Sequence, residues 1–186
     1  MKRINVIGTT GSGKSTFSKA LADNLEIPYI QLDELFWKQG WTESSDDELF
    51  SKLEASMSAE AWVLDGNYSR TNELKWSRTD TVVWLDYGFV RTFLQLLKRT
   101  LKRSLSNEEL WPGTGNRESF TRSFLSKDSI LVWFLRTYFG NRTSNKEILE
   151  SPALGHIRMV RLASPREAER FLNDASLEPD YSGPSH

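Results

Sequence analysis

The residues best suited to chemistry lie near the start of the chain, in a glycine-rich stretch. Gly8-Thr9-Thr10-Gly11-Ser12-Gly13-Lys14-Ser15 matches the pattern G-x-x-x-x-G-K-[ST]. Glycines allow backbone conformations closed to other residues, so successive N–H groups can surround phosphates at a helix N-terminus. Lys14 is expected to contact the β- and γ-phosphates, and Ser15 to supply a hydroxyl ligand to Mg²⁺. The expected nucleotide-binding residues are Gly8, Gly11, Ser12, Gly13, Lys14, Ser15 and Thr16.

The stretches on either side of this motif favour the same interpretation. Ile4–Ile7 is a short apolar run typical of a strand, and Lys14–Leu25 places Phe17, Leu21 and other apolar residues at helical spacing. A strand before the glycines and a helix after them is the context that a phosphate-binding loop needs. The motif therefore predicts binding of ATP with Mg²⁺ rather than an ordinary glycine-rich turn.

Three carboxylates end or directly follow short apolar runs: Asp33, Asp65 and Asp86. Such runs are typical of buried parallel strands, and open sheets of this kind bind ligands at the carboxyl ends of their strands. Two of the aspartates also have a structural interpretation, since Asp33 can cap a helix and Asp65 can cap the turn before Gly66. The sequence alone leaves both interpretations open.

Composition narrows the classes of function. The 186 residues fit one domain, and 24 Lys and Arg against 25 Asp and Glu argue against a dedicated nucleic-acid or membrane-surface binder. Cysteine is absent and there are only two histidines, which excludes disulfides, thiolate catalysis and histidine-rich metal sites. No apolar run is long enough to cross a bilayer. We expect a cytoplasmic protein with no membrane partner, acting as a monomer or a homodimer.

Strand-like and helix-like stretches alternate along the chain, which predicts an α/β fold with a parallel sheet. One domain is expected over 1–175, and the polar stretch 176–186 is expected to be a loose tail. Phe89–Leu105 carries leucines along one helical face, and an aromatic-rich helix is expected over Ser119–Tyr138. The segment before the last strand is too long for one crossover, so we expect an inserted helical lid over about 105–150.

Four further stretches carry a resemblance to a known family: Leu32-Asp33-Glu34-Leu35-Phe36-Trp37, Trp62-Val63-Leu64-Asp65-Gly66-Asn67-Tyr68, Trp84-Leu85-Asp86 and Gly115-Asn116-Arg117-Glu118. Together with the phosphate loop, they make the chain resemble the small P-loop kinases related to adenylate kinase and shikimate kinase. The subgroup labelled DNA topology modulation proteins is the most similar. The resemblance implies a P-loop NTPase fold with a five-stranded parallel sheet in the order 2-3-1-4-5, flanked by helices, and a mobile lid.

The resemblance also implies roles for the aspartates. Asp65 resembles the Asp in the Asp-Gly-Phe-Pro-Arg segment of adenylate kinases, which implies a place in the Mg²⁺ shell beside Ser15, with Asp86 as its competitor. Asp33 stands where shikimate and gluconate kinases carry an acidic residue that holds the acceptor hydroxyl and can take its proton. Gln31 replaces the first carboxylate of their pair, so Asp33 alone is the predicted acceptor residue.

Arginines are the third group of candidate site residues. Arg99 and Arg103 lie one helical turn apart, where both guanidinium groups can reach the same anion. They resemble the Arg-x-x-x-Arg at the start of the adenylate kinase lid, which implies contacts to adenine and phosphates. Among four arginines in or near the predicted lid, Arg117 has flexible flanks and is the predicted catalytic arginine. The other three are expected at the surface: Arg122, Arg136 and Arg142.

Two functions fit these residues. The first is an ATP-dependent kinase that transfers the γ-phosphoryl group to a small acceptor, either a nucleotide or a hydroxyl-bearing metabolite, with Lys14, Asp33 and Arg117 in catalysis. The second is an ATP-binding regulator that acts on nucleic acid or a partner protein through the basic helix 91–103. A nucleic-acid binder would show a broader basic face, so we favour the kinase.

The acceptor itself is not identified by the sequence. Phe36, Trp37 and Trp41 can form an apolar wall for it, or they can belong to the core. The Thr-Gly-Asp segment with which adenylate kinases bind AMP is missing, so adenylate kinase proper is not expected.

Overall fold

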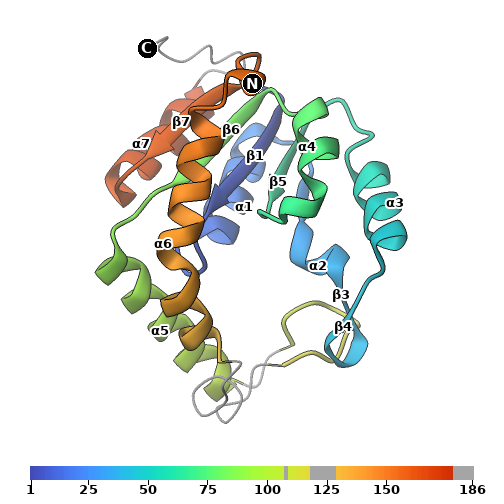
Figure 1. The fold of residues 1–186 in the computed structure, drawn as a ribbon, viewed down its shortest axis with the longest axis vertical. Helices are drawn as coiled ribbons and strands as arrows, with labels where there is room; N and C mark the ends of the chain where they lie inside the picture. Colours follow the sequence, from blue (N-terminus) through green and yellow to red (C-terminus); the bar gives the residue numbers. More distant parts are fainter. Residues whose placement is uncertain (107–108, 118–128, 178–186) are drawn as a thin grey trace.

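The computed structural model describes residues 1–106, 109–117 and 129–177. Its centre is a five-stranded parallel sheet in the order β2-β5-β1-β6-β7 (Figure 1). The strands are β1 (Arg3–Gly8), β2 (Tyr29–Gln31), β5 (Trp62–Asp65), β6 (Thr81–Leu85) and β7 (Arg158–Leu162). Counted along the chain, these are the first to fifth strands of the sheet, so the predicted order 2-3-1-4-5 is confirmed.

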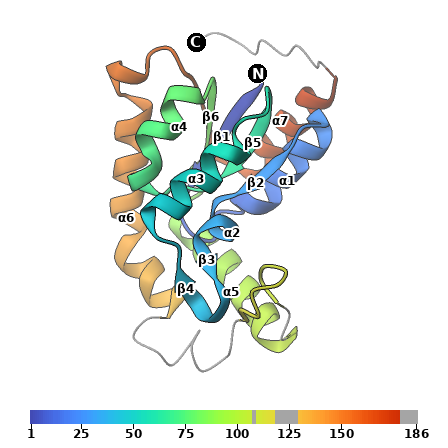
Figure 2. The same cartoon turned by 90° about the vertical axis from the view of Figure 1, so that its right-hand side faces the viewer.

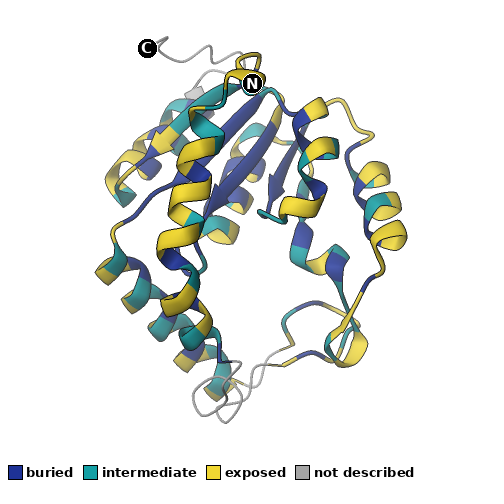
Figure 3. Cartoon of the chain, in the orientation of Figure 1, coloured by how far each residue is buried: buried dark blue, intermediate teal, exposed yellow. Residues whose placement is uncertain are grey.

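Alternate residues of the central strands face two helical layers. On one face, Ile4 and Val6 pack against α1 and α7, whereas Ile7 faces the opposite layer and packs against α4. Figure 2 shows the sheet between these layers, and Figure 3 shows that its three central strands are buried while the outer sides of the helices are exposed. The covering helices are α1 (Lys14–Leu25), α4 (Asn72–Arg78), α6 (Ile130–Leu149) and α7 (Pro165–Leu177).

A small antiparallel hairpin projects beyond the carboxyl edge of the sheet (Figure 1). Its segment consists of α2 (Leu32–Phe36), β3 (Trp37–Lys38), the 3₁₀ turn η1 (Gln39–Trp41), β4 (Thr42–Glu43) and α3 (Asp46–Ser56). Ser45 and Glu48 form a reciprocal capping box at the start of α3. This helix buries Leu49 and Leu53 beneath β5, which anchors the hairpin to the rest of the domain.

Helix α5 (Phe89–Ser106) corresponds to a predicted helix, but its leucine face is not its buried face. Leu94 and Leu105 are 56% and 82% exposed. The residues that α5 buries are Thr92, Leu96 and Thr100. The reason is a close approach to the phosphate loop, since a Cβ at Gly11 would lie only 2.7 Å from the Leu96 Cβ. The contact with the loop, and not the apolar stripe, sets the orientation of this helix.

Helix α6 begins later than the sequence predicted. Instead of covering 119–138, it runs from Ile130 to Leu149, because the Ser129 hydroxyl caps its N-terminus by accepting a hydrogen bond from the Leu131 amide at 3.2 Å. It extends beyond the predicted end because its last turn packs against the sheet in the cluster that contains Trp76. Tertiary packing therefore determined its length.

The predicted lid over about 105–150 is described only in part. Residues 107–108 and 118–128 lie outside the described residues, and the last part of the range is α6, which packs across β1. Helix α7 ends at Leu177, within the predicted tail 176–186, and the remainder of that tail also lies outside the described residues. No helix in the described ranges is both long and apolar enough to span a membrane.

Candidate functional site

A cleft of about 1280 Å³ opens at the carboxyl ends of β1, β2 and β5, with the phosphate loop at its base. Two walls enclose it, and they lie on opposite sides in Figure 1. The first, called the cationic wall here, comes from α5 and α6 and contains Gln95, Arg99, Arg103 and Arg136. The second, called the aromatic wall, contains Asp33, Phe36, Trp37, Trp41, Glu43, Tyr68, Arg70 and Trp111.

The phosphate loop has the geometry that its sequence predicts. Gly11 and Gly13 have φ of 83° and 90°, in the left-handed region that favours glycine, and α1 begins directly after them. No side chain caps α1, so its first N–H groups are available to an anion. The Ser12 hydroxyl is fully buried and has no hydrogen-bond partner in the described part of the chain. A buried orphan hydroxyl in a glycine loop fits a bound polyphosphate.

Lys14 lines the cleft together with the two predicted carboxylates, Asp33 and Asp65. Its ammonium donates a hydrogen bond to the Thr9 carbonyl at 3.1 Å. Burial lowers the pKa of Lys14, while the charges of Asp65 and Asp33 oppose that shift and the nearby Arg99 adds to it. A bound phosphate would give the Lys14 ammonium a charged partner in place of the neutral Thr9 carbonyl, and such a bond is stronger.

Asp65 is buried at the end of β5 and makes contacts suited to a metal ligand. Its Oδ2 accepts a hydrogen bond from the Tyr29 hydroxyl at 3.2 Å, and Ser15 lines the same end of the cleft. Burial raises the pKa of Asp65, and the charge of Lys14 opposes the rise. The turn-capping interpretation does not require Ser15 nearby, whereas a shared metal ion does.

Asp33 lies on the aromatic wall, in the first turn of α2. Its Oδ1 accepts a hydrogen bond from the Tyr68 hydroxyl at 2.9 Å. Burial raises the pKa of Tyr68, and the charge of Asp33 raises it further, so the tyrosine is a proton donor in this pair at neutral pH. One carboxylate oxygen of Asp33 is thereby engaged, and it is held close to Lys14.

Arg99 and Arg103 both line the cleft from α5, as does Gln95 one turn earlier. The close packing of α5 on Gly11 brings this face of the helix to the phosphate loop. Arg136, expected at the surface, also lines the cleft from α6 although its side chain is exposed. These positions suit contacts to a nucleotide.

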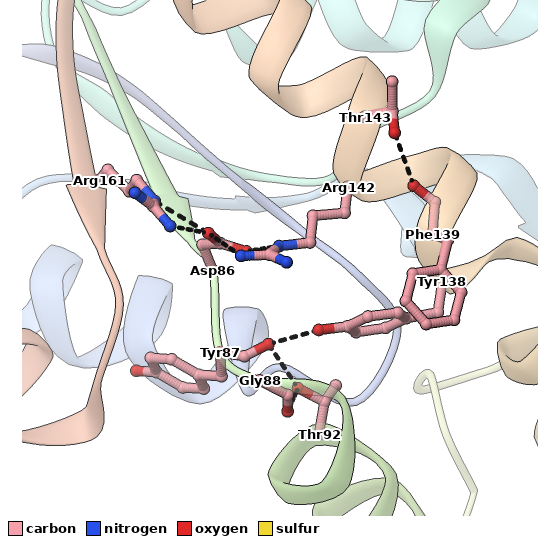
Figure 4. A network of polar contacts seen from close by, with 9 residues as sticks. All are labelled: Asp86, Tyr87, Gly88, Thr92, Tyr138, Phe139, Arg142, Thr143 and Arg161. Carbon is pink, nitrogen blue, oxygen red and sulfur yellow. Dashed lines mark hydrogen bonds and ion pairs between the residues drawn. The ribbon is translucent and has the colours of Figure 1, made fainter.

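Asp86, the competitor for the metal role, is occupied by arginines (Figure 4). Arg142 Nε donates to its Oδ1 at 2.6 Å, and Arg161 Nε donates to its Oδ2 at 2.8 Å. Burial alone would raise the pKa of Asp86, but the hydrogen bonds from both arginines outweigh burial and lower it. Asp86 therefore links β6 to α6 and β7, and Arg142 has a structural partner.

Arg117, the predicted catalytic arginine, lies at an isolated antiparallel bridge with Glu109. It is exposed and is not among the described residues that line the cleft. Arg122 lies outside the described residues. The catalytic role of Arg117 stays a prediction.

The residues of the aromatic wall belong partly to the hydrophobic core and partly to the lining of the cleft. Phe36 is buried in a core cluster and also lines the cleft, whereas Trp37 and Trp41 are half-buried and line it. The Trp41 ring centroid lies 5.6 Å from that of Trp37 and 5.8 Å from that of Trp111. A continuous aromatic surface therefore faces the cleft.

The sequence analysis did not identify the tyrosines that are hydrogen-bonded to Asp33 and Asp65. Tyr68 belongs to one of the stretches that carry the family resemblance, but the resemblance assigned it no role. Tyr29 begins β2 and carried no local signal. Their partners are 35 and 36 residues away along the chain, so only the sheet topology brings them together.

Comparisons with known proteins identify the family of the chain. No protein-family profile matches the chain. A shikimate kinase from Sulfurihydrogenibium sp. (strain YO3AOP1) is 32% identical in an alignment of 127 residues that covers 59% of this chain and 75% of that protein. The chain belongs to the shikimate kinase family. It is a small-molecule P-loop kinase that uses ATP to phosphorylate a hydroxyl-bearing metabolite.

Solved structures show the same fold. A gluconokinase from Sinorhizobium meliloti 1021 is 20% identical, with a TM-score of 0.51, over 95% of this chain and 94% of that one. Shikimate kinase from Aquifex aeolicus vf5 is 17% identical, with a TM-score of 0.50, over 94% of both chains. Because both structures are at most 20% identical to this chain, their similarity shows the fold alone.

Proposed function

We propose that the chain transfers the γ-phosphoryl group of ATP to a hydroxyl of a metabolite held on the aromatic wall. The observation that carries this proposal is that Lys14, Asp33 and Asp65 line one cleft beside the phosphate loop. Phosphoryl transfer needs a cation, a metal-binding carboxylate and an acceptor-orienting carboxylate around one phosphate. The three residues supply this set.

Each residue has a distinct task in the proposed reaction. Lys14 neutralises charge on the β- and γ-phosphates, and Arg99 and Arg103 bind the nucleotide from the cationic wall. Asp33 orients the acceptor hydroxyl and takes its proton as the hydroxyl oxygen bonds to the γ-phosphorus and the bond to ADP breaks.

Mg²⁺ is the metal implied by the family, and the residues fit it. Ser15 and Asp65 both line the cleft at the phosphate loop, and both present the oxygen ligands that Mg²⁺ prefers. These two residues would hold the ion, which when bound with ATP supplies neutralisation of phosphate charge.

The finer sequence-based expectations stay predictions. They are membership in the subgroup labelled DNA topology modulation proteins, a cytoplasmic location, and a monomeric or homodimeric state. The regulator hypothesis gains no support, because Arg99 and Arg103 line the cleft instead of the outer surface of the basic helix.

Two substitutions separate nucleotide binding from transfer. Lys14→Ala should abolish measurable ATP binding and turnover, because the polyphosphate loses its main cationic partner. Asp33→Asn should leave ATP binding nearly normal and reduce transfer by about 10² or more, the scale of a positioned acid–base group. Calorimetry with Mg²⁺-ATP and an ADP-release assay over small alcohols and nucleotides measure the two steps.

The outcomes that contradict the proposal are specific. Unchanged ATP affinity in the Lys14→Ala variant would refute the role of the phosphate loop. Loss of ATP binding in Asp33→Asn, with transfer per bound ATP preserved, would move Asp33 to the nucleotide site.

A further inference from the structure

The exposed apolar side chains of this protein are gathered on two helices that pack against each other. In the described part of the chain, α5 and α6 carry all of the large apolar side chains that are exposed: Val90, Leu94, Leu101, Leu105, Trp133, Leu135 and Phe139. Trp133 lines the cleft, and the others do not. A concentration of this kind on one part of a surface marks a site of interaction.

The apolar surfaces of the two helices meet at the start of α5. The Phe89 ring stacks with the Phe139 ring of α6, with the two centroids 5.8 Å apart. From there an apolar stripe runs along α5, with side chains that are between 38% and 82% exposed: Val90, Leu94, Leu101 and Leu105. The stripe lies on the outer side of a helix, so its surface is a convex ridge instead of a groove.

The apolar stripe faces away from the cleft. Leu101 follows Arg99 by two positions, and two positions turn an α-helix by about 200°. Arg99 lines the cleft, so Leu101 lies on the opposite side of α5. A partner that covers the stripe would therefore leave the cleft open.

A row of cations runs beside the apolar stripe. Arg91, Lys98 and Lys102 are exposed, and residues 87–107 contain no acidic side chain. Arg91 and Lys98 are three and four positions from Leu94, so helical spacing makes them its neighbours on the surface. A partner that fits this face must offer an apolar layer together with negative charge.

We propose that this face of α5 docks on the surface of an anionic lipid bilayer. The apolar stripe would enter the boundary between headgroups and acyl chains, and Lys98 and Lys102 would lie among the anionic headgroups. A convex amphipathic helix with a basic flank suits that boundary, whereas a partner helix binds in a groove.

This docking is independent of the phosphoryl-transfer reaction. It also differs from the sequence-based expectation of no membrane partner. The reason is that helical spacing identified a leucine face on α5 but could not show that the face stays exposed in the fold.

Charge argues against a second copy of the chain as the occupant. In an antiparallel pair of α5 helices related by a two-fold axis, the basic flank of one helix lies beside the basic flank of the other. Lys98 and Lys102 would then meet the same residues of the copy, and like charges repel. An anionic bilayer meets the same flank with opposite charge.

Vesicle flotation with the full chain tests the proposal. The vesicles are pure phosphatidylcholine, or phosphatidylcholine with about 40% phosphatidylglycerol, whose headgroup is anionic. The buffer contains about 0.1 M salt, so that charges beyond the surface are screened. We expect the protein to float with the anionic vesicles and to stay largely unbound with the neutral ones.

Two double variants separate the apolar from the charged contribution. Leu94→Gln/Leu101→Gln should weaken binding to the anionic vesicles at least about tenfold, because less apolar surface leaves water. Lys98→Gln/Lys102→Gln should weaken it by about tenfold and remove the preference for anionic vesicles. Calorimetry should give unchanged ATP affinity for both, which shows that the fold is retained.

Matched single variants serve as controls. Trp133→Gln removes an exposed apolar side chain from the cleft instead of the stripe, and Lys52→Gln removes an exposed cation from α3. Neither should change vesicle binding. A loss in either control as large as in the double variants would contradict the assignment of the surface to α5.

Three further results would overturn the proposal. Equal binding to neutral and anionic vesicles would remove the role of the cations. No binding to the anionic vesicles would leave an acidic protein surface as the alternative partner. A lipid-free dimer in analytical ultracentrifugation that dissociates in the Leu94→Gln/Leu101→Gln variant would assign the stripe to a second copy.

Discussion

At the scale of single residues, the pairing of Tyr68 with Asp33 gives a sharp prediction. The tyrosine donates to Asp33 Oδ1 and so orients the carboxylate, whose second oxygen would receive the acceptor hydroxyl in the proposed reaction. Tyr68→Phe should therefore lower kcat by about tenfold and leave the KM for ATP unchanged, since one hydrogen bond to a charged group is lost. Acceptor-dependent ADP release measures both constants.

A double-mutant cycle provides the control for this positioning role. In an Asp33→Asn background, Tyr68→Phe should have little further effect, because the two residues act as one unit. Tyr29→Phe is the matched variant at Asp65 and should change the Mg²⁺ dependence instead. Additive effects of the two substitutions at positions 33 and 68 would show that Tyr68 serves only the packing of Phe36, whose ring centroid lies 4.9 Å away.

At the scale of elements, α5 presents different faces to the cleft and to solvent. Arg103 lines the cleft, while its neighbour Lys102 is exposed and points elsewhere on the helix. Arg103→Ala should weaken binding of ADP and ATP by about tenfold or more, and Lys102→Ala should have little effect, since only the first loses a charge-assisted contact to the nucleotide. Calorimetry at two salt concentrations measures this difference. Equal nucleotide affinities would remove Arg103 from the site, and salt-sensitive oligonucleotide binding lost in both variants would favour a regulator.

At the scale of the whole molecule, a buried lysine couples stability to pH. Lys75 is fully buried, its ammonium has no hydrogen-bond partner within the described ranges, and it lies 4.9 Å from the centroid of the Trp76 ring. Burial lowers the pKa of Lys75 from 10.5 to about 7. The unfolded chain binds this proton up to its ordinary pKa and the folded chain does not, so this group makes stability rise between about pH 7 and 10, by up to about 1.4 kcal/mol per pH unit.

Lys75→Met tests this coupling. The variant should melt at a higher temperature at pH 7, because an unpaired buried cation is replaced by a thioether of similar length, and its stability should depend less on pH. The exposed Lys52→Met is the control and should retain the wild-type slope. Urea unfolding at several pH values gives the slopes. A wild-type slope in the Lys75→Met variant would mean that other groups cause the pH dependence.

The sequence alone predicted those parts of the site in which the residues involved are close together along the chain. The spacing of glycines before Lys14 requires left-handed backbone and a helix start, and both are observed. The one-turn separation of Arg99 and Arg103 puts them on one face of a helix wherever that helix lies. Runs of buried apolar residues marked the strands, and family resemblance supplied their order in the sheet.

Tertiary structure alone decided which side chains meet, because their contacts join residues far apart in the chain. The Asp86 carboxylate accepts hydrogen bonds from two arginines, which are 56 and 75 residues away along the chain. Both of its oxygens are therefore engaged, which argues against a role as a metal ligand. The exposed leucines of α5 have the same origin, since the absence of a side chain at Gly11 let the helix pack through another face. The sequence by itself determined a nucleotide-binding loop and the carboxylates near it. The ion pair between Arg70, which lines the cleft, and Asp46 came only from the fold, because the two residues are 24 positions apart in the chain.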